Sequence, residues 1–463
     1  MNGEHRPAQG RPTTPVAVCY NSDSCIQSII RYALGDPGLR RASTLLLLSA
    51  SLASLSCGSA TPPGGSSGVK IASRAFVSQD VSAGHVSAGL IVIDAQRDVE
   101  PIGAAIPAGA TPGMMVVTPN RNQTLVFSSA DKLFSVINNA SQASAAQVTL
   151  PGLTESFVVS PDSLTAYVAV PTARVVGQAP GAVEVVGLSN GKFTAEIDIP
   201  AVHFLSMNHS GNRILAFSDN SNLVAVITPS NIGTQNPVVT FVDGSLVGHP
   251  FDLPIAASFG SDDNTANIVN CGAECGGIQA SVQTLDLTTN TPAAAIPVPA
   301  ASVAIVNGTT MYLAGTPVPA SLCTGQQTAA TSCGLLTVFD LPSMSVTKSG
   351  IVITDGYHNR MALGANGQLF IGAKTCTEII PPVPPPPSAE ARGCLAIYNT
   401  QTGDVVIPPA NGDATGIQPI ANRTVVYVVQ GGELAIYDTA TDKLQSTQID
   451  VNGQAIDVKT IDF

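Results

Sequence analysis

The chain has 463 residues, of which only 11 % are charged, and it carries a formal net charge of −12 at pH 7. An acidic surface repels phosphate backbones, so nucleic acid is excluded as an expected partner. The 42 Gly and 34 Pro residues and the absence of Trp, together with frequent Val, Thr and Ala, favour short strands and turns over helices.

The N-terminal segment predicts export. Arg40 and Arg41 precede an apolar run over residues 42–55, which is too short to span a bilayer because a spanning helix needs about 20 apolar residues. A positive region, a short apolar region and small residues before a cleavage site are typical of a secretory signal peptide. We therefore expect a signal peptide over residues 39–57. We interpret residues 1–38 as a mis-assigned start or a disordered lead.

The residues that end this segment resemble a bacterial lipobox, in which the Cys is lipidated and becomes the new N-terminus. The motif reads Ser54-Leu55-Ser56-Cys57, and it departs from the usual pattern because Ser54 stands where Leu is common. Cleavage after Ala60 is the alternative. We expect lipidation of Cys57, a flexible Ser/Gly/Pro-rich linker over residues 58–70, and an outer-membrane or cell-surface lipoprotein whose only membrane contact is its lipid. A periplasmic or secreted location is the alternative.

From residue 71 onward one short apolar phrase recurs eight times. The copies lie at residues 90–94, 133–137, 183–186, 223–227, 282–286, 336–340, 395–399 and 434–438. A strand-forming repeat of about 40–50 residues is typical of a β-propeller. We predict an all-β chain in which residues 71–463 form an eight-bladed propeller. Seven blades are the alternative, because the fifth repeat (residues 237–286) is irregular.

Each repeat supplies four strands, which we letter A to D from the axis outward, with the apolar phrase as strand C. Only one strand, residues 74–79, precedes the first phrase, and it is expected as strand B. Residues 99–107 should follow that phrase as strand D. After the last phrase come a D strand over residues 444–449 and a final A strand over residues 455–463. The C-terminal strand is therefore predicted to complete the N-terminal blade, which closes the ring and removes unpaired strand edges.

The repeats resemble the YVTN-type, WD-repeat-like propeller family of bacteria. The matching residues are Val92-Ile93-Asp94, Ile106-Pro107-Ala108-Gly109, Val159-Ser160-Pro161-Asp162 and Tyr167-Val168-Ala169. The resemblance covers about residues 71–463, although several copies depart from the family's Ser-Pro-Asp-Gly turn, as at Asn208-His209-Ser210-Gly211. It implies the fold and says little about activity.

Six cysteines follow Cys57, and an even number in an exported protein predicts disulfide bonds. They are Cys271, Cys275, Cys323, Cys333, Cys376 and Cys394. Each neighbouring pair falls between strands B and C of one blade, in three successive blades, which predicts that near neighbours are paired. A zinc site is the alternative, but no second pair or His stands at ligand spacing from Cys271 and Cys275. We expect no metal, and we interpret Asp262-Asp263-Asn264 as a turn and not as a calcium loop.

Five polar residues are candidates for catalysis: Glu155, His203, His249, His358 and Arg360. The three His lie where strand D passes to the next strand A, at the expected mouth of the central channel, and the other two lie at comparable register. Propeller enzymes, including lactonases and quinoprotein-like dehydrogenases, often place polar groups there. The residues come from different blades, however, so we interpret them as turn residues. Their convergence in one pocket would favour an enzyme.

The expected function is that of a monomeric, lipid-anchored module that binds an envelope protein or glycan, with no catalysis and no cofactor. The alternative is a hydrolase or lactonase-like propeller enzyme that uses the channel mouth. All three cystine loops should lie on one face of the ring, because the B-to-C and D-to-A connections emerge together. Insertions on one face of a repeat fold usually mark its binding face. Binding is therefore predicted to depend on residues 271–394, above all on the proline-rich run 381–387.

Overall fold

Short alternating apolar segments form strands throughout the part of the chain that the computed structural model describes. That part comprises residues 71–80, 89–101, 103, 105–319, 333–377, 393–445, 448–451 and 453–462. Residues 71–463 form one unit and residues 1–70 a separate one. The predicted signal peptide, Cys57, the linker and the proline-rich run 381–387 therefore lie outside the described residues.

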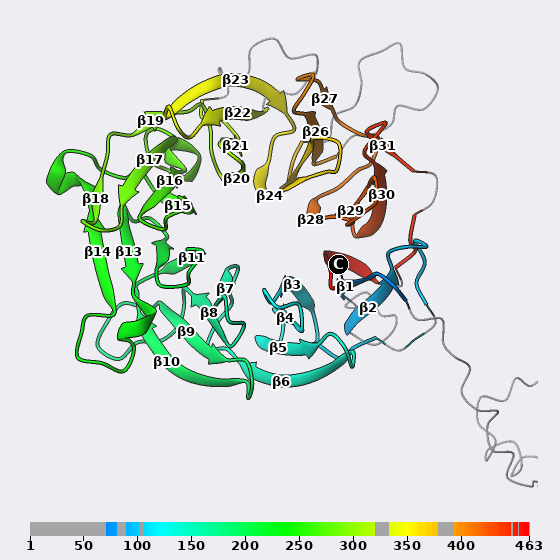
Figure 1. The fold of residues 1–463 in the computed structure, drawn as a ribbon, viewed down its shortest axis with the longest axis horizontal. Coiled ribbons are helices and arrows are strands. Elements are labelled where there is room, and N and C mark those ends of the chain that lie inside the picture. Colours follow the sequence, from blue (N-terminus) through cyan, green and yellow to red (C-terminus); the bar gives the residue numbers. More distant parts are fainter. Residues whose placement is uncertain are drawn as a thin grey trace, which may run out of the picture. The chain divides into compact units, whose positions relative to one another are not determined.

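Eight antiparallel sheets stand in a ring (Figure 1), so the predicted eight-bladed propeller is confirmed. The innermost strands (A) are β32 (Gln454–Thr460), β3 (Pro112–Val117), β7 (Phe157–Val159), β11 (Val202–Met207), β15 (Pro254–Phe259), β20 (Val303–Asn307), β24 (Tyr357–Leu363) and β28 (Ala414–Pro419). The second strands (B) are β1 (Arg74–Asp80), β4 (Gln123–Ser128), β8 (Thr165–Val170), β12 (Ile214–Ser218), β16 (Thr265–Asn270), β21 (Thr310–Gly315), β25 (Gln368–Lys374) and β29 (Val425–Gln430). We number the blades 1 to 8 in this order.

The third strands (C) coincide with the eight apolar phrases. They are β2 (Gly89–Asp94), β5 (Leu133–Asn138), β9 (Ala182–Gly187), β13 (Leu223–Ile227), β17 (Ser281–Asp286), β22 (Gly334–Asp340), β26 (Leu395–Asn399) and β30 (Glu433–Asp438). The outer strands (D) are β6 (Ala143–Thr149), β10 (Lys192–Asp198), β14 (Val239–Asp243), β18 (Thr291–Pro292), β19 (Ile296–Pro297), β23 (Ser345–Ile353), β27 (Val405–Val406) and β31 (Lys443–Leu444). The short 3₁₀ helices are η1 (Pro229–Asn231), η2 (Gly244–Val247) and η3 (Gly272–Cys275).

The chain ends share blade 1, as predicted. Strand β1 pairs on one side with β2 and on the other with β32, with Ala75 opposite Thr460. The guanidinium of Arg74 also forms an ion pair with Asp462 at 2.7 Å. The last strand therefore supplies the inner strand of the first blade and pairs the inner edge of β1.

Two outer strands are less regular than predicted. In blade 1 the segment expected as strand D makes only isolated bridges, from Val99 to Asp94 and from Ile106 to Leu90. Blade 5, the irregular fifth repeat, has its outer strand split into β18 and β19, which both pair with β17. Proline residues in these segments cannot donate to a ladder, which restricts them to an edge that pairs in short pieces.

The hydrophobic core is divided into eight clusters, and each joins two neighbouring blades. Between blades 2 and 3, for example, Phe134 and Phe157 meet edge to face with ring centroids 5.2 Å apart. One such buried aromatic side chain contributes roughly 1.5–3 kcal/mol when it leaves water. Because every cluster needs both of its blades, the ring is stable only as a whole.

Polar groups near the axis also join successive inner strands. The amide of Leu205 donates to Ser156 Oγ at 2.9 Å, and the amide of Ala257 donates to Ser206 Oγ at 3.1 Å. At the closure of the ring, the amide of Met115 donates to the buried carboxylate of Asp457 at 2.9 Å. These bonds fix the inner strands relative to one another and so hold the axial wall rigid.

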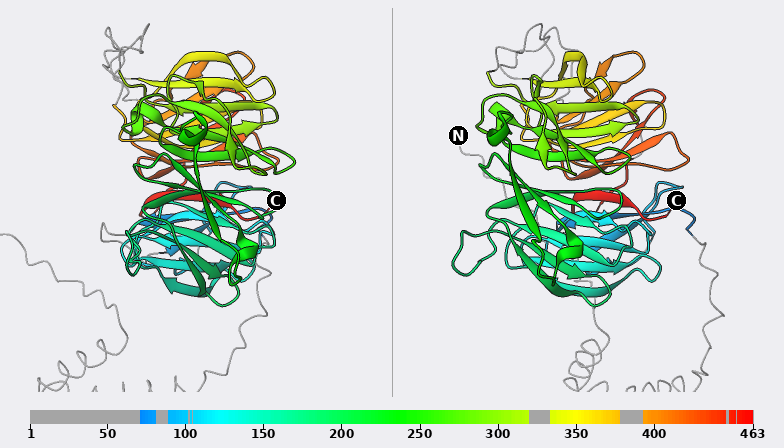
Figure 2. Two further views of the ribbon diagram at one scale, coloured as in Figure 1. Left: turned by 90° about the vertical axis from the view of Figure 1, so that its left-hand side faces the viewer. Right: turned by 60° about the vertical axis from the view of Figure 1, so that its left-hand side comes forward.

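Loops leave the sheets on two opposite faces of the ring (Figure 2). On one face lie the D-to-A and B-to-C connections, and we call it the cystine face because both described disulfides lie there. Cys271 pairs with Cys275 between β16 and β17, and Cys376 pairs with Cys394 between β25 and β26. Both pairings confirm the prediction. Cys333 is also disulfide-bonded, and its predicted partner Cys323 lies outside the described residues.

Candidate functional site

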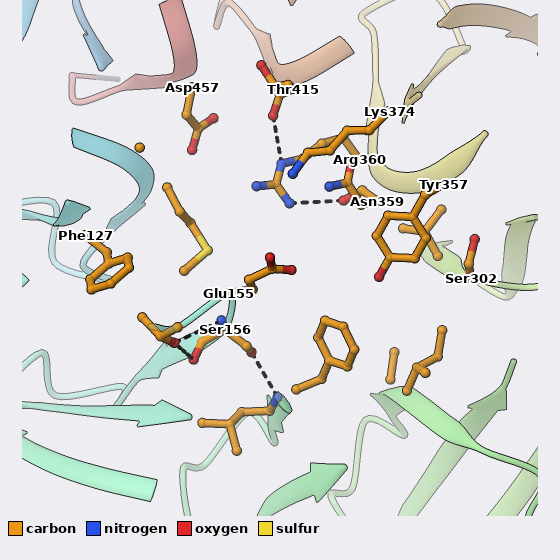
Figure 3. A pocket seen from close by; sticks show the side chains of 18 of the residues that line it. Phe127, Glu155, Ser156, Ser302, Tyr357, Asn359, Arg360, Lys374, Thr415 and Asp457 are labelled. Atoms are coloured by element: carbon orange, nitrogen blue, oxygen red, sulfur yellow. Dashed lines mark hydrogen bonds between the residues drawn. The ribbon is translucent and has the colours of Figure 1, made fainter. Parts of the chain in front are cut away.

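A cavity of about 420 Å³ lies at the axis and receives residues from all eight blades. We call it the channel-mouth cavity. Apolar side chains that line it include Met114, Phe127, Leu153, Phe204 and Ile255. Its charged and polar side chains include Glu155, Tyr357, Asn359, Arg360, Lys374 and Asp457 (Figure 3). Volume and composition are those of a small-molecule or side-chain pocket, in which an apolar wall surrounds a few polar groups.

A second cavity of about 390 Å³ adjoins the first on the cystine face. The two share Glu155, Phe204, Ile255 and Tyr357. The second also reaches His203, Asp219 and Cys275. The cystine of blade 5 therefore borders the same opening as the polar residues of the axis.

His203, at the start of β11, lies between two carboxylates. Its Nδ1 lies 2.7 Å from Asp219 Oδ1, and its Nε2 lies 3.5 Å from Glu155 Oε2. The ring also stacks on Phe204 with centroids 4.1 Å apart. Burial alone would lower the pKa of His203, but the hydrogen bonds to Glu155 and Asp219 outweigh it and raise the pKa. The same contact with His203 lowers the pKa of Glu155.

Two cations from blade 7 face the cavity. Arg360 lies on β24, and its Nε donates to the carbonyl of Thr415 at 3.0 Å while its Nη1 donates to the carbonyl of Asn359 at 3.0 Å. Lys374 ends β25 directly opposite Tyr357 in the antiparallel register. Burial raises the pKa of Tyr357 to about 12, and the charge of Glu155 adds to this effect. The phenol is therefore a neutral donor at the mouth.

The structure brings together three of the five predicted candidates. Glu155, His203 and Arg360 border the connected cavities. His358 does not, because it is fully buried and its ring Nε2 donates to the carbonyl of Thr354 at 2.8 Å. His249 lines neither cavity, and its carbonyl accepts a bond from Gln283 Nε2. His358 is therefore not at the predicted channel mouth, because it lies on strand β24 with its ring buried, and His249 lies between η2 and β15 outside both cavities.

Sequence reasoning missed Tyr357, Lys374 and Asp219. Each stands at the end of an A or B strand, where the repeat pattern carries no special residue type. One signal was available, because the chain has only 20 Lys and Arg and one of them, Lys374, ends strand β25 of blade 7. Because cations are uncommon in this chain, one at the end of an A or B strand indicates a candidate binding residue.

A metal centre finds no support in the described ranges, since they hold no group of three or more His, Cys, Asp or Glu placed to bind an ion. Asp262-Asp263-Asn264 forms a turn, as interpreted. The Asp263 carboxylate accepts bonds from the amides of His209 and Ser210 in the neighbouring blade. Despite partial desolvation these bonds lower its pKa to about 2. The carboxylate therefore joins blades 4 and 5.

No family model and no curated protein matches the sequence. Solved structures with the same fold include dihydro-heme d1 dehydrogenase NirN, with 12 % identity and a TM-score of 0.54 over 84 % of this chain and 75 % of that one. Kuenenia stuttgartiensis hydrazine synthase matches with 13 % identity and a TM-score of 0.52 over 74 % and 98 %. The Dos1 propeller matches with 10 % identity and a TM-score of 0.53 over 74 % and 85 %. The chain is a β-propeller protein, and these similarities extend to the fold alone.

Proposed function

We propose that this chain is an exported, lipid-anchored propeller that binds a partner through its cystine face and catalyses no reaction. The observation that carries the proposal is that both described cystines lie on the cystine face, where Cys275 borders the opening of the axial cavities. A cystine limits the freedom of its loop and so lowers the entropy cost of presenting that loop to a partner. The partner is an envelope protein or glycan.

Export is supported by the disulfides, because such bonds persist in oxidising compartments outside the cytoplasm. The lipobox-like Cys57 supports attachment by lipid. None of the described residues belongs to a helix long and apolar enough to cross a membrane. The resemblance of the repeats to the YVTN type supports a bacterial envelope propeller.

The alternative, a hydrolase or lactonase-like enzyme, draws on the meeting of Glu155 and His203. Both ring nitrogens of His203 face carboxylates, however, which holds the ring as a two-proton donor. An imidazolium in this position has no free nitrogen with which to accept a proton from water or a hydroxyl nucleophile. The arrangement therefore favours binding over general-base catalysis.

Two leucines of blade 3 allow a matched test of whether the partner binds to the cystine face. Leu153 lines the channel-mouth cavity on the cystine face and is 52 % exposed, whereas Leu164 lies in the turn between β7 and β8 on the opposite face and is 61 % exposed. Neither contributes much to the core. An aspartate at either position should therefore leave the fold intact.

Three versions of the domain (residues 71–463) are immobilised: the wild type, L153D and L164D. Each is used to capture binding partners from envelope extract. We expect L153D to lose the captured species and L164D to retain them. Equal capture by both variants, or selective loss with L164D, would contradict the cystine face as the binding face. Thermal midpoints of the three proteins establish that all are folded.

A further inference from the structure

We propose that the channel-mouth cavity binds an organic carboxylate, and that Arg360 and Lys374 hold its oxygens. The inference rests on the proposed function, since it names the chemical group of the partner that enters the cavity. The ligand class is a single carboxylate attached to an apolar group. Four observations carry it: the fixed guanidinium, the second cation, the engaged acid and the apolar wall.

Arg360 is held in place by acceptors that carry no net charge. Its Nε and Nη1 donate to the carbonyls of Thr415 and Asn359, both at 3.0 Å (Figure 3). These bonds orient the planar group and leave its remaining donors for the cavity. Of the ion pairs between described residues, none includes Arg360. The guanidinium is therefore preorganised and its charge is not compensated by a direct partner.

Lys374 adds a second positive charge to the same cavity (Figure 3). It also takes part in none of the ion pairs between described residues. Two like charges that line one partly buried cavity repel each other, and the repulsion is relieved when an anion lies between them. A carboxylate has two oxygens and so can accept from both cations at once.

Glu155 is the acidic side chain of the cavity that could neutralise Arg360 and Lys374, but it contacts a different residue. Arg360 and Lys374 are close enough for their charges to lower the pKa of Glu155. Its direct contact, at 3.5 Å, is nevertheless with His203. Figure 3 shows the carboxylate of Glu155 in the middle of the view, below the guanidinium of Arg360. Among the ion pairs of the described residues, Glu155 therefore pairs with His203 and with neither cation, and its charge opposes the binding of an anion by repulsion.

The rest of the wall selects an organic ligand. Met114, Phe127, Phe204 and Ile255 offer apolar surface within about 420 Å³, a volume in the range of small-ligand sites. The carboxylate of Glu155 and the net charge of −12 disfavour a ligand with several negative charges. A monoanion with an apolar body satisfies both the cations and the wall.

The test is calorimetric titration of the domain with N-acetyl-phenylalanine and with N-acetyl-phenylalaninamide, which differ only in the carboxylate. We expect the acid to bind at least about tenfold more tightly than the amide, as expected for a charge-assisted contact. Lys374→Gln should weaken binding of the acid about tenfold. Lys348→Gln, on the exposed face of β23, is the matched control and should change nothing. Glu155→Gln should tighten binding several-fold, because it removes the like charge.

Glucuronate and glucose form a second matched pair, which distinguishes an acidic sugar from a peptide-like carboxylate as the source of the group. Tight binding of N-acetyl-phenylalanine that depends on Lys374 supports the inference, whereas tight binding of glucuronate alone would contradict the apolar group. Equal binding of acid and amide, no binding of either acid, or an unchanged affinity in Lys374→Gln would overturn it. Failure of the proposed function can be distinguished from failure of this inference. It would show as equal capture of partners by L153D and L164D, while the titrations with the acids remained as expected.

Discussion

Arg74 and Asp462 are 388 residues apart in the chain, and their side chains form a hydrogen-bonded ion pair at 2.7 Å. Asp462 also accepts from the backbone amide of Arg74 at 2.8 Å and from its Nη2 at 2.8 Å. The contact lies next to the pairing of β1 with β32. It therefore reinforces the seam at which the ring closes.

The first prediction concerns this seam. Asp462→Asn should lower the free energy of unfolding by about 1–3 kcal/mol, because charge-assisted bonds to a partly buried guanidinium are lost. Urea unfolding measures this change, with Asp450→Asn, an exposed position that precedes β32, as the control. The same stability in both variants would show that the seam does not depend on this pair.

The second prediction compares the two described cystines. Cys376 and Cys394 are 18 residues apart, whereas Cys271 and Cys275 are 4 apart. A longer closed loop restricts the unfolded chain more, by about 1 kcal/mol for this difference in length. The double Ala variant at residues 376 and 394 should therefore be the less stable of the two double variants in urea. The reverse order would contradict an entropic origin of the stabilisation.

The third prediction is a loss of stability in mild acid through His358. Burial of this side chain, which is 0 % exposed, lowers its pKa to about 4. The unfolded chain binds the proton near pH 6.5 but the folded chain does not, so this contribution to stability is complete above pH 6.5 and is lost as the pH falls toward 4. We expect a decline on the order of 2–3 kcal/mol. Urea titrations at several pH values should show a flatter profile for His358→Gln, and parallel profiles would refute the assignment.

The fourth prediction has the opposite sign and concerns blade 3. Glu184 is 3 % exposed and lies opposite Glu196 across β9 and β10. Burial, together with the charges of Glu196 and Asp198, raises the pKa of Glu184 to about 7. Its contribution to stability is therefore complete below pH 4.5 and is lost as the pH rises through 7. Glu184→Gln should gain a few degrees in thermal midpoint at pH 8 relative to wild type and gain least at pH 5. A gain that is independent of pH would point to packing instead.

The fifth prediction concerns membrane attachment. If Cys57 is lipidated, Cys57→Ala should move the protein from the membrane fraction to the soluble fraction, because the acyl chains supply its anchorage. Fractionation followed by immunoblotting measures this. Unchanged partitioning would require another mode of attachment.

The sequence was sufficient to predict the propeller because each blade repeats one local pattern. The C strands, for example β26 (Leu395–Asn399), have buried apolar side chains on both faces, so their apolar runs are visible without a structure. Disulfide pairing followed from register for the same reason. The site was less predictable, since it depends on where strand ends point around the ring. His358 and Arg360 are two residues apart on β24, yet one is buried between sheets and the other lines the cavity.

The shared blade also has a consequence for how the protein is made. Blades 2 to 8 each consist of consecutive chain, so the strands of each blade can pair with one another soon after the last of them has been synthesised. Strands β1 and β2 are made first, but their inner neighbour is the last strand of all. During synthesis the inner edge of β1 therefore stays unpaired until β32 has been made. An unpaired strand edge of this kind can pair with another molecule. The earliest part of the propeller is thus the last to be finished, and anything that delays or removes β32 leaves the edge of β1 exposed.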